Sequence, residues 1–116
     1  MRRAKKGQSH SSSVHLRDGD SGRVVGVKVG DMLEVDLEEN PTTGYSWQVG
    51  PLPSVLELKD SRYAPDHPQL CGSGGRRTFR FAVVMPGSGK LGLEYRRAWE
   101  KEAAPARVFE ITLESA

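Results

Sequence analysis

The sequence predicts an all-β protein, an antiparallel β-sandwich of about seven strands. Seven short stretches alternate apolar and polar residues with a period of two, and clusters of Gly, Pro, Asn and Asp separate them at spacings of roughly 8 to 15 residues. No stretch keeps a helical period over three turns. Many short strands with regular turn signals are typical of two sheets packed face to face.

The expected strands follow one another without an internal repeat or domain boundary. They are residues 23–30, 31–38, 45–49, 55–63, 76–85, 90–99 and 106–114. In each stretch the larger apolar residues share one face, as Leu33, Val35 and Leu37 do, with Met32 in the opposite phase. We expect these faces to form the core.

Residues 1–22 are polar, charged and rich in Ser and Gly, which predicts a disordered tail ahead of one folded domain at residues 23–116. Four basic residues lie in the first six positions, and subtracting them from the net charge of +2 leaves the rest of the chain at −2. A nucleic-acid surface on the fold itself is therefore not expected.

The start of the chain has no apolar segment behind its basic residues, so it does not resemble a secretory signal. We expect a cytoplasmic protein, or a secreted or periplasmic one if a signal was removed. No apolar run approaches the roughly 18 residues of a membrane span, and the single cysteine allows no intrachain disulfide.

Three of the connections between the expected strands are unusual in composition. With the strands lettered A to G from residue 23, they are the B–C connection at 38–44, the D–E connection at 64–75 and the F–G connection at 97–105. In an immunoglobulin-like sandwich these connections meet at one end. We call them the first, second and third loops, and we expect them to share one surface.

The first loop contains two threonines between constrained residues. Pro41 fixes its own φ and biases Asn40 away from the helical region. Gly44 can supply a positive φ where the chain enters the next strand. Thr42 and Thr43 would then be presented with little conformational entropy left to lose. The alternative is a rigid hairpin connection without a binding role.

Aromatic residues stand beside the first and third loops. Tyr45 and Trp47 share one face of the strand 45–49, which favours a place in the core. Trp99 follows a strand and lies among charges next to Arg97, a composition typical of an interface hot spot. The alternative for Trp99 is that it closes the end of the core.

The second loop contains the glycine-rich sequence CGSGG at residues 71–75. It lacks the lysine and hydroxyl spacing of a phosphate-binding loop. A catalytic pair of Cys71 with His67, or a metal site of both with Asp66, is not favoured, so we expect no enzyme, metal or cofactor. The glycines would form a flexible tip, or would let another backbone approach closely.

Together the three loops resemble the chagasin family of cysteine-protease inhibitors. The family pattern has N-P-T-T-G-[YF], G-x-G-G and R-P-W loops in this order. The chain has NPTTGY at 40–45, GSGG at 72–75 and RAW at 97–99, and the resemblance spans about residues 25–113.

The resemblance implies an immunoglobulin-like fold and a reversible, competitive inhibitor of papain-like, cathepsin L-type cysteine proteases. The three loops would form a wedge in the active-site cleft, with Thr42 and Thr43 against the catalytic cysteine and histidine. The backbone of 72–75 would pair with the enzyme, and Arg97 and Trp99 would pack on the far wall. The implied binding residues are Asn40, Pro41, Thr42, Thr43, Gly44, Tyr45, Gly72, Ser73, Gly74, Gly75, Arg97, Ala98 and Trp99.

One departure from the family pattern is Ala98, which stands where the family has proline. The loss of this φ restraint shifts conformational free energy by about 0.4–1 kcal/mol, so we expect a looser third loop. We also expect a monomer. The alternative function is an immunoglobulin-like adhesion or ligand-binding module that does not inhibit proteases.

Overall fold

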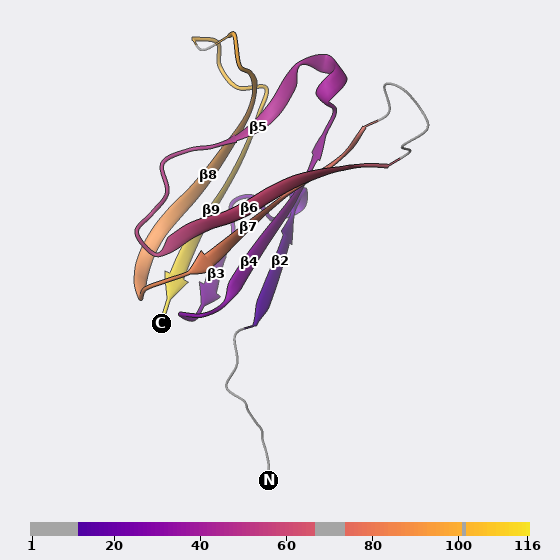
Figure 1. The fold of residues 1–116 in the computed structure, drawn as a ribbon. Coiled ribbons are helices and arrows are strands. Elements are labelled where there is room, and N and C mark those ends of the chain that lie inside the picture. The colour runs from indigo at the N-terminus through magenta and orange to yellow at the C-terminus, as the bar shows by residue number, and fades with distance from the viewer. Residues whose placement is uncertain (1–11, 67–73, 101) are drawn as a thin grey trace.

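The computed structural model describes residues 12–66, 74–100 and 102–116, which form a sandwich of two β-sheets (Figure 1). The strands are β2 (Ser13–Arg17), β3 (Val24–Val27), β4 (Met32–Glu39), β5 (Tyr45–Val49), β6 (Leu56–Pro65), β7 (Gly75–Val83), β8 (Gly87–Arg97) and β9 (Arg107–Ser115). Two 3₁₀ helices, η1 (Asp18–Asp20) and η2 (Pro41–Thr43), lie between strands. The strand order is β2-β4-β7-β6 in the first sheet and β3-β9-β8-β5 in the second.

All seven expected strands are present, and the fold class is confirmed. Leu33, Val35 and Leu37 of β4 are buried, while Met32 is only half-buried. Strands β4, β7 and β6 take the B, E and D places of an immunoglobulin-like sandwich, and β5, β8 and β9 take C, F and G. The apolar core of the sandwich consists of Leu16, Val25, Val27, Leu33, Val35, Leu37, Trp47, Val55, Leu56, Phe79, Phe81, Val83, Leu91, Leu93, Tyr95, Phe109, Ile111 and Leu113.

Strand β2 lies in the stretch that we predicted to be disordered, so that prediction was wrong for residues 13–22. The strand pairs with β4 over five residues, and η1 follows it directly. Its inward apolar side chains are only Val14 and Leu16, of which Leu16 is buried. Two such residues among serines and charges give a weak pattern, and the strand depends on its long-range partner.

The antiparallel prediction was also wrong at two edges, because β2 runs parallel to β4 and β3 runs parallel to β9. Between them the chain crosses from the first sheet to the second through η1. One N-terminal segment therefore closes an edge of each sheet. The other edge strands are β6, which leads into the second loop, and β5, which follows the first loop.

The first, second and third loops gather at one end of the sandwich, as the sequence predicts. Figure 1 shows the β4–β5 connection, the described ends of the β6–β7 connection and the described part of the β8–β9 connection at the end opposite both chain termini. Within the second loop, residues 67–73 are outside the described part of the chain. The same holds for residue 101 in the third loop.

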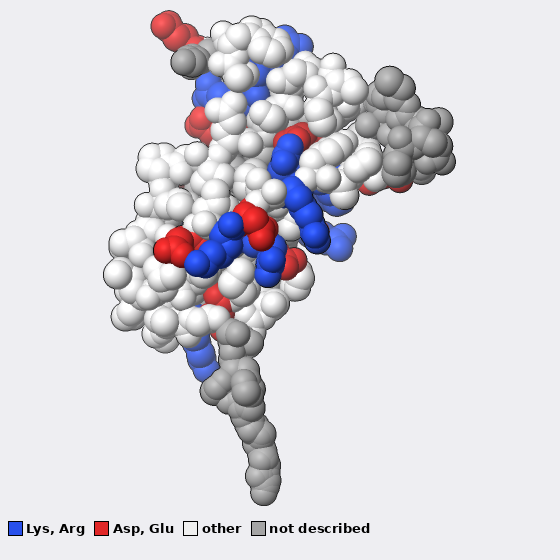
Figure 2. Space-filling view, in the orientation of Figure 1, with Lys and Arg blue, Asp and Glu red and all other residues white. Residues whose placement is uncertain are grey.

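Charged side chains of both signs alternate on the face of the molecule seen in Figure 2. In the first sheet, Arg80 of β7 lies 3.5 Å from Glu34 of β4 and 3.2 Å from Asp60 of β6, measured between side-chain nitrogen and oxygen atoms. Such exposed, interleaved pairs contribute little net stability each. They are typical of a solvated sheet face.

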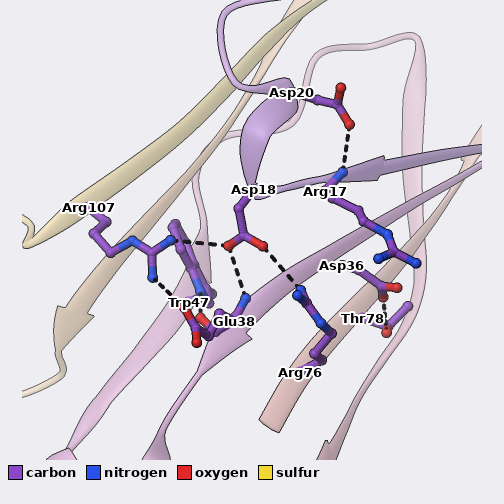
Figure 3. Close-up of polar contacts among 9 residues, drawn as sticks. All are labelled: Arg17, Asp18, Asp20, Asp36, Glu38, Trp47, Arg76, Thr78 and Arg107. Carbon is purple, nitrogen blue, oxygen red and sulfur yellow. Dashed lines mark hydrogen bonds and ion pairs between the residues drawn. The ribbon is translucent and has the colours of Figure 1, made fainter. Parts of the chain in front are cut away.

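Asp18 of η1 connects the two sheets (Figure 3). Its Oδ2 accepts hydrogen bonds from the backbone N–H of Glu38 in β4 and from Nη2 of Arg107 in β9, both at 3.1 Å. Its Oδ1 accepts one from Nη1 of Arg76 in β7, also at 3.1 Å. Partial burial raises the pKa of the Asp18 carboxyl, but the bonds from Glu38 and Arg76 outweigh it and hold the pKa below its usual value.

We expect Asp18→Asn to lower the free energy of unfolding by about 1–2 kcal/mol near neutral pH, because charge-assisted hydrogen bonds are lost at a partly exposed site. The pKa is lower in the folded state, so the carboxylate stabilises the fold fully above its unfolded pKa of about 4. This contribution disappears as the pH falls through the folded value. Urea unfolding at several pH values should therefore show the free energies of unfolding of the native chain and of Asp18→Asn converging below about pH 4. A difference that does not depend on pH would contradict a stabilising role of the Asp18 carboxylate.

Candidate functional site

The first loop is held by hydrogen bonds among its own polar groups. Oδ1 of Asn40 accepts from the backbone N–H of Thr42 at 3.2 Å and from the Thr42 hydroxyl at 2.6 Å. The Thr43 hydroxyl donates to the carbonyl of Asn40 at 2.7 Å and accepts from the N–H of Tyr45 at 3.3 Å. Both threonines are exposed, yet their hydroxyls are engaged inside the loop. The loop therefore presents a preformed surface.

The base of the first loop rests on three aromatic side chains. Trp47 and Tyr95 are buried, and their rings lie 5.0 Å apart between centroids. Tyr45 is half-buried and stacks on Tyr95 at 5.3 Å. The Tyr95 hydroxyl accepts a hydrogen bond from the backbone N–H of Asn40 at 3.0 Å. The predicted place in the core is confirmed for Trp47, whereas Tyr45 is partly buried and packs against the core.

The third loop packs directly on the first. Trp99 is 70% exposed, which places it outside the core, and its ring covers Gly44. Gly44 has a φ of +83°, and a Cβ there would lie 2.4 Å from Cη2 of Trp99. The Arg97 guanidinium lies 4.5 Å from the ring centroid of Tyr45 and 5.9 Å from that of Trp99. Nε of Arg97 also donates to the carbonyl of Thr43 at 3.2 Å.

The third loop also has internal bonds in its described part. The backbone N–H of Glu100 donates to the carbonyl of Arg97 at 3.1 Å, and the N–H of Ala103 donates to the carbonyl of Glu100 at 3.2 Å. Just outside the loop, the N–H of Ala106 donates to the carbonyl of Tyr95 at 2.8 Å. Ala98 is exposed between them. Contacts of its neighbours with the first loop thus supply restraint at the position where proline is missing.

The second loop meets the first at its described C-terminal end. A Cβ on Gly74 would lie 3.6 Å from the carbonyl oxygen of Glu39, and one on Gly75 would lie 2.3 Å from that of Ala64. Close backbone approach is therefore one reason for glycine at position 75, whereas the contact at Gly74 has an ordinary van der Waals distance. Four residues named in the sequence analysis lie outside the described part of the chain: His67, Cys71, Gly72 and Ser73.

The geometry thus brings the predicted site residues of the first loop together with Arg97, Ala98 and Trp99, and with the described glycines of the second. The family model of the chagasin family peptidase inhibitor I42 matches residues 26–113. The chain belongs to the chagasin family of peptidase inhibitors. Members of this family are inhibitors and not enzymes.

Known proteins similar to this chagasin-family chain include Amoebiasin-1 of Entamoeba histolytica, which is 33% identical over 93 residues, 78% of this chain and 88% of that protein. The crystal structure of a cysteine protease inhibitor from Entamoeba histolytica superposes with a TM-score of 0.84 at 22% identity, covering 94% of this chain and 100% of the other. An inhibitor solved in complex with falcipain-2 has a TM-score of 0.57 at 19% identity, covering 94% and 93%. These two structures share the fold.

The described part of this chagasin-family chain contains no group of three or more His, Cys, Asp or Glu side chains that could hold a metal ion. Nor does any helix in that part have the length and apolar character needed to cross a membrane.

Three further residues, which the sequence motifs do not include, support the loops. Tyr95 lies in the core, but its hydroxyl also holds the backbone of the first loop. Glu39 and Arg77 were overlooked, although each continues the inward phase of its strand and so breaks the apolar pattern. The sequence does contain a signal for this pair. An acidic and a basic residue occupy inward positions of two strands, where apolar residues are expected.

Proposed function

We propose that this chain is a reversible, competitive inhibitor of papain-like, cathepsin L-type cysteine proteases. Its first, second and third loops would enter the active-site cleft as one wedge. The observation that carries this proposal is the packing of Trp99 and Arg97 on the first loop, which makes two distant segments one exposed surface. Membership of a peptidase inhibitor family supports the same function.

The mechanism is occlusion without a covalent step. Thr42 and Thr43 would lie against the catalytic cysteine and histidine, the backbone of 72–75 would pair beside them, and Trp99 would pack on the far wall. Because the loops are ordered before binding, association loses less entropy. A wedge of three loops would bury a standard interface of roughly 1,600 Å². No peptide bond of the inhibitor is presented in register for attack, so the inhibitor is released uncleaved. It would act as a monomer.

An inhibition panel tests this function. Papain and a cathepsin L-like enzyme should be inhibited by the chain at submicromolar concentration, with apparent KM raised, kcat unchanged and activity recovered on dilution. Trypsin, a serine protease, is the control and should stay active. Full activity of both cysteine proteases at a micromolar concentration of the chain would instead favour the alternative function, an immunoglobulin-like adhesion or ligand-binding module.

Gly44→Ala should weaken inhibition of papain about tenfold. A side chain at φ +83° costs about 1–2 kcal/mol, and the new Cβ would meet the Trp99 ring, so the indole must leave its place on the first loop. Inhibition constants and thermal unfolding of this variant measure both effects.

Gly26→Ala is the matched control, because nothing lies within 4 Å of a Cβ there and its φ is not positive. This control should inhibit papain as the native chain does. Equal inhibition by Gly44→Ala would contradict a coupled surface of the first and third loops.

A further inference from the structure

An ion pair between the buried Glu39 and the partly exposed Arg77 lies at the base of the first and second loops. The Glu39 residue is 1% exposed, and its Oε2 accepts hydrogen bonds from Nε and Nη2 of Arg77 at 3.2 and 3.0 Å. Its Oε1 accepts from the backbone N–H of Trp47 at 2.9 Å. The carboxylate therefore contacts β5 and β7 while belonging to β4.

This carboxylate bridges the two strands that flank the first loop. Strand β4 belongs to the first sheet and β5 to the second, so no backbone ladder joins them. The N–H of Trp47 lies on the open edge of β5 and would lack a strand partner. Glu39 accepts from that N–H, and the indole Nε1 of Trp47 donates to the carbonyl of Glu38 at 2.8 Å. These two bonds fix the separation of the loop ends.

Arg77 extends the same contact to the second loop. Its guanidinium lies 5.7 Å from the ring centroid of Tyr63, on β6, the strand that leads into that loop. Arg77 itself is two residues after Gly75, where β7 leaves the loop, and Gly75 pairs with Glu39 across the first sheet. The ends of both loops therefore meet at one ion pair.

Stability alone does not account for this pair. Burying the Glu39 carboxylate and partly burying the Arg77 guanidinium costs desolvation energy that offsets much of their attraction, and apolar side chains of similar size are commonly as stable. The neighbouring inward positions of the same strands are apolar, as in Leu37 and Phe79. What an apolar pair could not supply is an acceptor for the Trp47 N–H and a fixed angle between β4, β5 and β7.

We propose that Glu39 and Arg77 are positioning residues that set the first and second loops in the relative geometry needed to enter the protease cleft. This inference rests on the proposed inhibitory function. Neither side chain touches the protease in this scheme, because Glu39 is buried and Arg77 is turned toward it. They act through the ends of the loops.

The test is a double-mutant cycle of Glu39→Gln and Arg77→Gln against papain. Each single variant should raise the inhibition constant about tenfold, and the double variant should raise it no further, because either change already breaks the coupling. The double variant leaves no unpaired charge, so its inhibition constant can still be measured if a single variant does not fold. Inhibition constants within about twofold of the native chain in all three variants would overturn the proposal.

Asp31→Asn is the matched control for lost stability. Asp31 is also buried, at 7% exposure, and accepts from the backbone N–H groups of Ser12 and Lys28, but it precedes β4 and so lies at the end of that strand remote from the first loop. It should lower the melting temperature without changing the inhibition constant. If it weakened inhibition as much as Glu39→Gln does, the role of Glu39 would be stability and not positioning.

Amide hydrogen exchange separates this inference from the proposed function. The N–H groups of Thr43 and Gly44 are bonded within the first loop, to the carbonyls of Asn40 and Pro41. Glu39→Gln should accelerate their exchange, while Asp31→Asn should not. If the native chain left papain active, the inhibitory function would fail, and unchanged exchange in Glu39→Gln would independently overturn the positioning role.

Discussion

Thr43→Asp is expected to abolish inhibition of papain-like proteases while the sandwich stays folded. Thr43 is exposed in the free chain, so a charge there should be tolerated by the fold. In the proposed complex it lies against the catalytic cysteine and histidine, where an unpaired carboxylate would lose its hydration. That penalty is at least about 3 kcal/mol, more than a hundredfold in affinity. The carboxylate would also face the carbonyl of Asn40, which now accepts the Thr43 hydroxyl.

Two further substitutions at Thr43 separate charge from loop geometry. Thr43→Ser keeps the hydroxyl and both of its loop hydrogen bonds, so inhibition should stay within a few-fold of the native chain. Thr43→Val keeps the shape of the side chain but loses those hydrogen bonds. Its inhibition constant should lie between those of the serine and aspartate variants. Inhibition constants and circular dichroism spectra of the three variants provide the comparison. Tight inhibition by Thr43→Asp would exclude the first loop from the cleft.

Trp99→Ala should weaken protease binding by about 2 kcal/mol or more, roughly thirtyfold, as loss of a central interface tryptophan commonly does. At 70% exposure the ring makes little contribution to the core, so thermal stability should change little. Its removal also takes away one of the ring contacts of Arg97 and uncovers Gly44, which adds to the loss by loosening the first loop. Surface plasmon resonance should show the change mainly as faster dissociation.

The matched control for Trp99→Ala is Val108→Ala, at another exposed apolar residue that lies on β9 outside the three loops. It should bind as the native chain does. Unchanged binding by Trp99→Ala would place the tryptophan in solvent even in the complex and would remove the third loop from the proposed wedge.

Much of the fold could be predicted because each strand carries its own signal. In β4 the alternation of Leu33, Val35 and Leu37 determines which face is buried, since side chains alternate strictly along a strand. Strand β2 escaped prediction because it has only two inward apolar residues. Its stability comes from pairing with β4, a contact that no local pattern encodes.

The candidate site divides along the same line. By itself the sequence predicted a constrained first loop, because Pro41 and Gly44 restrict the residues between them, and strand counting placed the three loops at one end. The cap that the Asn40 side chain forms was visible only in the structure. Only the tertiary structure showed that Trp99 covers Gly44 and that Glu39 reaches Arg77 and Trp47. These contacts join residues on different strands and in different sheets, so they depend on strand register and on how the sheets pack. Neighbouring residues determine local conformation, whereas the relative position of the loops is determined only when the two sheets pack together.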